Sequence, residues 1–166
     1  MAMRTTATAY NAGVARSRKP YVRPPSVAGP RKATVIDKIR RACKFPHVTE
    51  KSSHGMPGFF IDGKNAFCYI TDNHHSDGRF ALWCAAPDGM QQMLVDSDPD
   101  RYFVPPYVGP SGWIGVRLDR DTPWNDIVGI LEHAYVRKAP AKVLAIYRGE
   151  ATPTRSSRSR RRPSAR

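Results

Sequence analysis

The chain has 166 residues, 40% of them hydrophobic, which suffices for one folded domain with a core of its own. No apolar run approaches the length of a membrane span, and residues 1–30 lack the apolar segment of a secretory signal. Three cysteines, Cys43, Cys68 and Cys84, occur without close pairing, which favours a reducing compartment. The composition therefore excludes membrane-spanning and disulfide-stapled secreted classes and predicts a cytoplasmic protein.

The formal net charge is +13, and it is concentrated at the two ends of the chain. Residues 1–32 carry seven Lys and Arg and no acid, residues 148–166 carry seven Arg and one Glu, and residues 33–147 carry 13 bases and 13 acids. A basic excess favours a polyanion partner, because Lys and Arg displace the counterions of its phosphates. We therefore predict a nucleic acid, most simply DNA read with little sequence preference, contacted by basic residues of the two ends: Arg16, Arg18, Lys19, Arg155, Arg158, Arg160, Arg161, Arg162 and Arg166.

The two ends also differ from the middle of the chain in complexity. Residues 1–32 are polar and rich in proline without any helical or strand period, and residues 148–166 consist mainly of Ser, Arg and Pro. Neither segment can bury enough apolar area to offset the entropy of ordering its backbone. We predict disordered basic tails on both sides of a single domain at residues 33–147.

The domain begins with a predicted amphipathic helix. Thr34 can cap its N-terminus, with Asp37 three residues on as a weak capping box. Apolar residues then recur at spacings of three and four until Phe45-Pro46 ends the helix.

Two β-hairpins follow in the sequence pattern. A strand at residues 48–53 leads into a hairpin of residues 58–61 and 66–70, turned by Asp62-Gly63. Glycine accepts positive φ without steric cost, so this tight turn predicts a positive φ at Gly63.

The second hairpin joins strands at residues 67–71 and 79–84 through the polar loop 72–78. The loop contains His74 and His75 with two aspartates, which raises the question of a metal site. No third soft ligand lies at the spacing of a structural zinc site. We interpret the loop as a solvated hairpin tip and predict no bound metal.

The next elements are a short helix at residues 89–96 and an irregular segment at residues 101–112. Pro105 and Pro106 lie in that segment, and proline cannot donate to a central ladder, so we expect an edge strand or a rigid loop. A last strand at residues 113–118 follows.

That last strand places Trp113 on the face opposite Ile114 and Val116, whose aliphatic side chains should meet the core. An aromatic side chain at such a place can stack on bases, but it more often only covers a sheet. A final helix is predicted to start at Asp121-Thr122-Pro123, a capping residue followed by proline at the first helical position. Its apolar stripe is the clearest in the chain, and one or two further turns can follow up to residue 147.

A set of motifs runs through the middle of the chain: Glu50, His54-Gly55-Met56-Pro57, Phe59, Gly63-Lys64, Phe67, and the segments 101–109 and 112–116. In combination these motifs resemble the MmcQ/YjbR-like family over residues 34–147. The resemblance implies a small single α+β domain with an antiparallel sheet flanked by helices. It also implies the DNA-binding role and double-wing motif that are predicted for the family.

No phosphate-binding loop, nucleophile elbow or zinc-binding helix motif occurs, so we predict no catalytic residues and no cofactor. The main prediction is a non-enzymatic nucleic-acid-binding protein whose tails supply much of the affinity. The alternative is a small-ligand-binding or enzymatic domain that uses the surface around Glu50, Lys64, Tyr107 and Trp113; Glu50 and Tyr107 match positions prominent in the family. A third option is an interaction domain whose tails bind acidic proteins.

Overall fold

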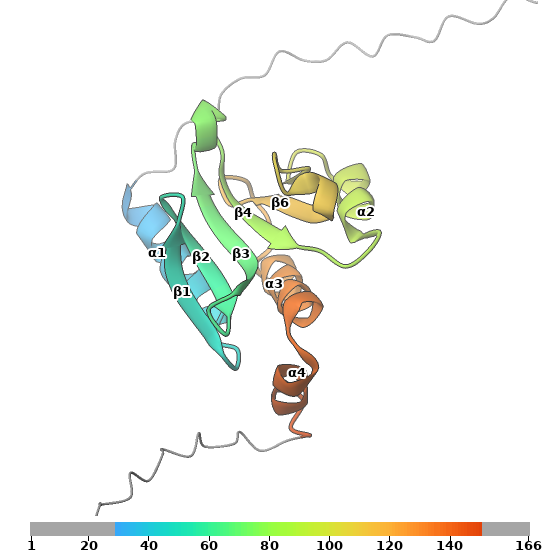
Figure 1. The fold of residues 1–166 in the computed structure, drawn as a ribbon. Helices are drawn as coiled ribbons and strands as arrows, with labels where there is room; N and C mark the ends of the chain where they lie inside the picture. The colour runs from blue at the N-terminus through green and yellow to red at the C-terminus, as the bar shows by residue number, and fades with distance from the viewer. Residues whose placement is uncertain (1–28, 151–166) are drawn as a thin grey trace, which may run out of the picture.

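A computed structural model describes residues 29–150, which form a small α+β domain with a six-stranded sheet (Figure 1). The predicted fold class and the predicted order of helices and strands are confirmed. The elements are α1 Gly29–Ala42, β1 Val48–Ser53, β2 Met56–Ile61, β3 Asn65–Asp72, β4 Phe80–Ala85, α2 Met90–Ser97, β5 Tyr102–Phe103, β6 Trp113–Arg117, α3 Trp124–Lys138 and α4 Ala141–Tyr147, with short 3-10 turns at His74–Ser76 and Gly109–Ser111.

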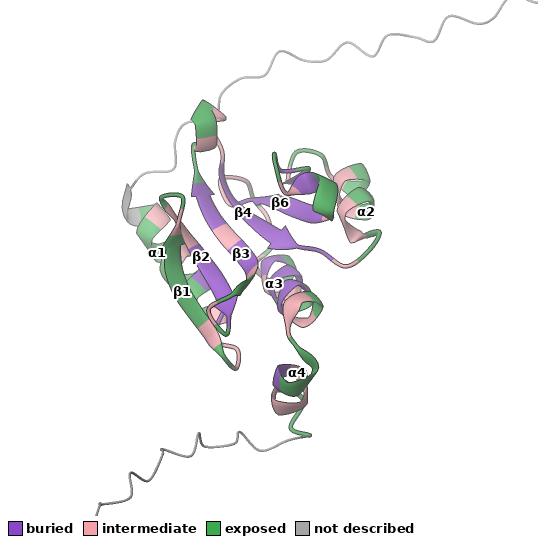
Figure 2. Ribbon diagram, viewed as in Figure 1, coloured by how far each residue is buried: buried purple, intermediate pink, exposed green. Residues whose placement is uncertain are grey.

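Every strand pairing in the sheet is antiparallel, in the spatial order β1-β2-β3-β4-β6-β5. The central strands are largely buried, whereas β1 at one edge is exposed (Figure 2). The other edge, β5, has only two residues and is followed by Pro105 and Pro106. The prolines therefore lie beside an edge, where a missing N–H leaves no central ladder bond unmade.

The helices pack against one face of the sheet, which we call the helical face. α3 contacts β3 and β4 there, and its fully buried residues include Leu131 and Tyr135. The Tyr135 ring stacks on Phe45 with centroids 4.5 Å apart and meets Phe67 edge-on at 5.8 Å. Its hydroxyl donates a hydrogen bond to the carbonyl oxygen of Pro46 over 3.0 Å, so the one polar atom of this large side chain is satisfied.

A β-bulge sets which aromatic residues reach which face. The pairing of β2 with β3 changes register between Phe59 and Phe60: Phe59 pairs with Cys68, whereas Phe60 pairs with Ala66. Phe67 is left as the extra residue of β3. It packs on Phe59 and on Tyr135 of α3, so both phenylalanines lie on the helical face.

Two tight turns close the first two hairpins. His54 and Gly55 join β1 to β2 with φ of 52° and 77°, and Asp62 and Gly63 join β2 to β3 with φ of 51° and 66°. Both central residues of each turn thus have the positive φ that a type I′ turn requires. The predicted positive φ at Gly63 is confirmed.

The helix starts differ from the prediction. α1 begins at Gly29, so residues 29–32 are helical and the disorder predicted for them is wrong. Lys32 binds Asp72 of β3 over 2.6 Å, a contact far along the chain that the local pattern could not reveal. In α3, Pro123 occupies the N-cap position instead of the first helical position, and no side chain caps the helix, so the start predicted from Asp121-Thr122-Pro123 is also wrong.

At the other end, residues 148–150 donate backbone hydrogen bonds to α4, which extends the folded part beyond residue 147. The nine basic residues predicted to contact nucleic acid lie outside the described residues. Within residues 29–150, no helix combines the length and the apolar character needed to cross a bilayer.

Candidate functional site

The face of the sheet opposite the helices, which we call the outer face, carries a floor of aromatic side chains. Tyr69 and Trp83 are cross-strand partners, and Gly115 is the next partner along the same row. Partners in antiparallel strands share a face, so all three positions lie on the outer face. A Cβ atom at Gly115 would lie 2.4 Å from the Phe103 ring, which therefore lies directly over this glycine. The Tyr69 ring also stacks on Trp113, with centroids 5.5 Å apart and planes 20° apart.

A cavity of about 550 Å³ lies over this floor. Its walls come from the β1–β2 turn, the loop between β3 and β4, and the loop between β5 and β6. The volume falls in the range of small-molecule sites, which is roughly 300–1,000 Å³. The lining residues are mainly aromatic and imidazole side chains: His54, Met56, Tyr69, His74, His75, Trp83, Tyr107 and Val108.

The backbone of the three surrounding loops is strained. Seven non-glycine residues among those described have positive φ, and five of them belong to these loops. Non-glycine residues at positive φ cost energy and persist where the surrounding structure holds them, which is common at ligand sites. The five are His54, Asn73, His75, Ser76 and Tyr107.

Two polar atoms at the cavity wall lack hydrogen-bond partners among the described residues. They are Nε1 of Trp83 and Nε2 of His74. Trp83 is only 3% exposed, so water does not reach its indole N–H in this arrangement. The His74 ring covers the indole edge-on, with centroids 4.8 Å apart. A buried donor without an acceptor is destabilising, and such an atom in a native fold calls for an explanation.

The mouth of the cavity is bridged by a hydrogen bond between two of its walls. The hydroxyl of Tyr107 lies 3.2 Å from Nε2 of His75. Tyr107 is 74% exposed, one of the most exposed large hydrophobic side chains among the described residues. This exposed ring lies at the edge of an apolar cavity and can move without disturbing the core.

The cavity lining contains no acidic side chain and no Lys or Arg. Burial lowers the pKa of His74 below its usual value of 6.5, and the neighbouring His75 lowers this pKa further, against an opposing effect of Asp77. His74 is therefore a neutral imidazole at pH 7, with one nitrogen able to donate and one able to accept.

A family comparison identifies the domain that carries this cavity. The YjbR family model matches residues 43–137, which is more than half of the chain. The chain belongs to the YjbR family. The resemblance seen in the sequence motifs is thereby confirmed, and the matched residues include the whole cavity lining.

A solved structure shares the fold of this YjbR protein. It is the crystal structure of protein DR2400 from Deinococcus radiodurans, described by the family domain DUF419. The match has a TM-score of 0.55 at 16% sequence identity and covers 69% of this chain and 86% of that one. At this identity the likeness shows the fold alone. No curated protein matches the chain.

The four residues of the predicted ligand site do not come together in this YjbR domain. Tyr107 lines the cavity, and Trp113 lies beside it through its stacking contact with Tyr69. Lys64 is an exposed residue of the β2–β3 turn and is not part of the lining. Glu50 lies on edge strand β1 and faces a separate hollow of about 430 Å³.

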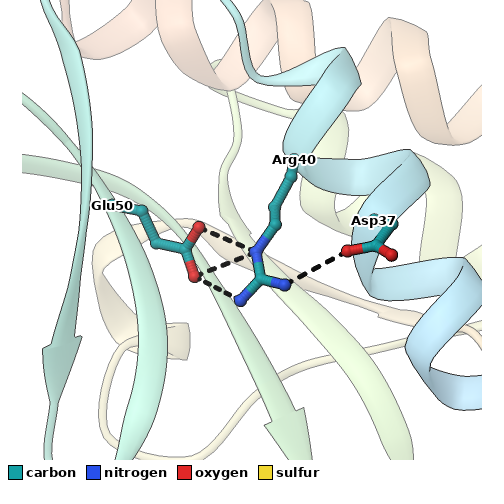
Figure 3. Close-up of polar contacts among 3 residues, drawn as sticks. All are labelled: Asp37, Arg40 and Glu50. Atoms are coloured by element: carbon teal, nitrogen blue, oxygen red, sulfur yellow. Dashed lines mark hydrogen bonds and ion pairs between the residues drawn. The ribbon is translucent and has the colours of Figure 1, made fainter.

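The Glu50 carboxylate is bound by Arg40 of α1 (Figure 3). Nε of the guanidinium donates to one carboxylate oxygen over 2.9 Å, and a terminal nitrogen donates to the other over 2.8 Å. Asp37 accepts a further hydrogen bond from Arg40 over 3.2 Å. The hydrogen bonds that Arg40 donates to Glu50 and, with a smaller effect, to Asp37 raise the pKa of Arg40 further above its usual range. Glu50 thus links β1 to α1 through an ion pair, so its charge stabilises the fold.

Sequence reasoning missed most of the cavity lining. The sequence pattern predicts a solvated tip for the loop with His74 and His75, but His74 is half-buried against Trp83, so the prediction is wrong for His74. The alternation of Tyr69 and Trp83 with fully buried Cys68 and Cys84 was the available signal for an aromatic outer face. Among residues 29–150, no group of three His, Cys, Asp or Glu side chains is placed to hold a metal ion.

Proposed function

We propose that this YjbR protein is a non-enzymatic nucleic-acid-binding protein whose two basic ends supply most of the affinity and little sequence preference. The observation that carries the proposal is the partition of charge. Residues 29–150 contain 16 Lys and Arg and 14 Asp and Glu, a net charge of +2 within a total of +13. The remaining positive charge belongs to residues 1–28 and 151–166, next to a compact domain that is nearly neutral.

Several Lys and Arg side chains of the folded part form ion pairs with its own carboxylates. Such pairs reduce the positive charge that the domain presents to phosphates. Lys51 of edge strand β1 is also engaged within the domain, because its ammonium group donates to the carbonyl oxygen of Gly63 over 2.6 Å and lies over the Phe60 ring. The paired cations are Lys32 with Asp72, Arg40 with Glu50, Arg101 with Asp98, Arg117 with Asp119, and Arg137 with Asp88.

Arginine outside the folded domain suits phosphate contacts that carry no sequence information. Its guanidinium offers several donors to phosphate oxygens and stays charged at any physiological pH. The three cysteines of the chain are free and buried, which supports a reducing, cytoplasmic setting where such contacts with nucleic acid can occur.

A salt titration of DNA binding by the full chain tests the proposal. The matched variant replaces the six arginines of residues 151–166 by glutamine. Each phosphate neutralised contributes a slope of about −0.9 to log affinity against log salt for duplex DNA, so the variant should flatten the slope by roughly 3–5. The control variant Arg41→Gln/Lys142→Gln removes two exposed charges of the folded part and should change the slope far less. An unchanged slope in the six-fold variant would show that residues 151–166 make no phosphate contacts and would contradict the proposal that both basic ends supply the affinity.

A second candidate function is the binding of a small ligand in the cavity on the outer face. Nε1 of Trp83 and Nε2 of His74 favour ligand binding, because a ligand could supply the hydrogen-bond partners that these two atoms lack. Its location differs from the sequence expectation, since Tyr107 lines the cavity whereas Glu50 and Lys64 do not.

A further inference from the structure

We infer that the cavity over Tyr69 and Trp83 binds one planar, uncharged heteroaromatic ring of the size of a nucleobase. The inference goes beyond nucleic-acid binding by the basic ends, because it needs no contact with phosphate. It rests on the shape of the cavity, on the absence of Asp, Glu, Lys and Arg from its lining and on the two unpartnered nitrogens of Trp83 and His74.

The shape of the cavity favours a flat ligand. Its floor consists of the rings of Tyr69 and Trp83, and its mouth carries the exposed ring of Tyr107. A ring that enters the cavity beside Tyr107 can stack on this exposed aromatic face, and aromatic faces are sequence-tolerant platforms for bases. A volume of about 550 Å³ accommodates one such ring with part of an attached sugar.

The electrostatics of the cavity select against charged ligands. Its lining contains no Lys or Arg to hold a phosphate and no Asp or Glu to hold a cation. An ion that entered would lose its hydration without an opposite charge in return. An uncharged ring avoids this cost, and Met56 and Val108 supply apolar contacts at its edge.

The unpartnered nitrogens define the polar pattern that the ligand must match. The indole Nε1 of Trp83 can only donate, whereas the neutral imidazole of His74 can donate or accept at Nε2. Nucleobases and related heterocycles present ring nitrogens and carbonyl oxygens beside amino or N–H groups on one edge, so one ring satisfies both atoms. The His74 ring covers the indole edge-on, and its rotation on ligand entry would open both atoms to the cavity. Asn73 and His75, on either side of it, both have positive φ, so the loop holds His74 over the indole in a defined turn.

Calorimetric titration of the full chain with adenosine and with uridine tests the inference directly. Neither nucleoside carries a phosphate, so the basic ends contribute nothing, and a negative result would leave salt-dependent DNA binding untouched. We expect saturable binding of at least one nucleoside, with little dependence on salt.

Two variants locate the site. Tyr107→Ala removes an exposed stacking ring, and we expect nucleoside binding to weaken about tenfold. Trp83→Phe keeps an aromatic floor but removes the indole N–H, with an expected loss of about three- to tenfold. The control Met93→Ala truncates another exposed hydrophobic side chain, 59% exposed on α2, and should leave binding unchanged. Tyr107 is at the surface, so its variant keeps the test valid even where Trp83→Phe folds poorly.

A second experiment distinguishes the two sources of such a ring, a free nucleoside and an unpaired base of a single strand. The probe is single-stranded oligothymidine with one central 2-aminopurine, used at high salt to screen the basic ends. Quenching of its fluorescence that Tyr107→Ala abolishes would assign the site to an unpaired base. Nucleoside binding without quenching would support the inference with a free heterocycle as ligand. The inference is overturned when the full chain neither binds a nucleoside nor quenches the probe, or when both pocket variants bind as tightly as the unaltered chain.

Discussion

The two faces of one sheet are built from the same strands but differ in how they are covered. On the helical face, Cys68, Cys84 and Ile114 are completely buried under α1 and α3. On the outer face, the neighbouring Tyr69 and Trp83 lie under loops that leave a cavity. Helices can close over a sheet because they satisfy their own backbone groups and present continuous apolar stripes.

Loops cover a sheet less completely, because their polar backbone must find partners one group at a time. On the outer face the result is a set of strained residues, two unpartnered nitrogens and a hollow of ligand size. The helical face is thus filled completely by packed side chains, whereas the outer face combines packed aromatic residues with space for binding.

The largest expected effect is on the helical face. Leu131→Ala removes a fully buried side chain of α3, where the packed neighbours cannot collapse into the space. We expect the free energy of unfolding to fall by about 2–5 kcal/mol, measured by urea denaturation. Met93→Ala on the exposed side of α2 is the control and should change it by less than about 0.5 kcal/mol. Similar losses of unfolding free energy in the two variants would contradict the assigned close packing of the helical face.

Two glycine substitutions, one on each side of the sheet, test how closely each position is packed. Gly115→Ala would push a methyl group into the Phe103 ring, 2.4 Å away, and should destabilise the domain by about 1–3 kcal/mol. Gly129→Ala in α3 meets nothing within 4 Å and should stabilise the domain by roughly 0.5–1 kcal/mol, because alanine is the better helix former. Thermal unfolding of both variants measures the two shifts, and shifts of the same sign would contradict the assigned packing of Phe103.

The smallest expected effect is a change in how the stability of the domain depends on pH, through His74 on the outer face. The pKa of His74 is lower in the folded domain than its usual value of 6.5, so the unfolded chain binds this proton more tightly. Its contribution to stability is therefore complete above about pH 6.5 and declines as the pH falls toward the lower folded value. His74→Gln should remove part of the stability loss between pH 7 and pH 5 in denaturation curves, and Met93→Ala should not. An identical pH profile in His74→Gln would show that the imidazole is not buried against Trp83.

Local patterns in the sequence predicted much of the fold. The apolar stripe of α3 and the Asp62-Gly63 turn depend only on neighbouring residues, and both appear where the pattern placed them. The edge position of the segment around Pro105 follows equally from the missing N–H of proline. The uneven distribution of charge is also a property of the sequence alone.

The residues that line the cavity could be identified only from the tertiary structure. Trp83 of β4 and Tyr107 of the β5–β6 loop belong to separate segments, and the sheet order β4-β6-β5 brings them to the same cavity. The same holds for Glu50, which the sequence offered as a ligand contact and which binds Arg40 instead. Contacts of this kind depend on register and strand order, which arise from the packing of the whole domain, and no local pattern encodes them.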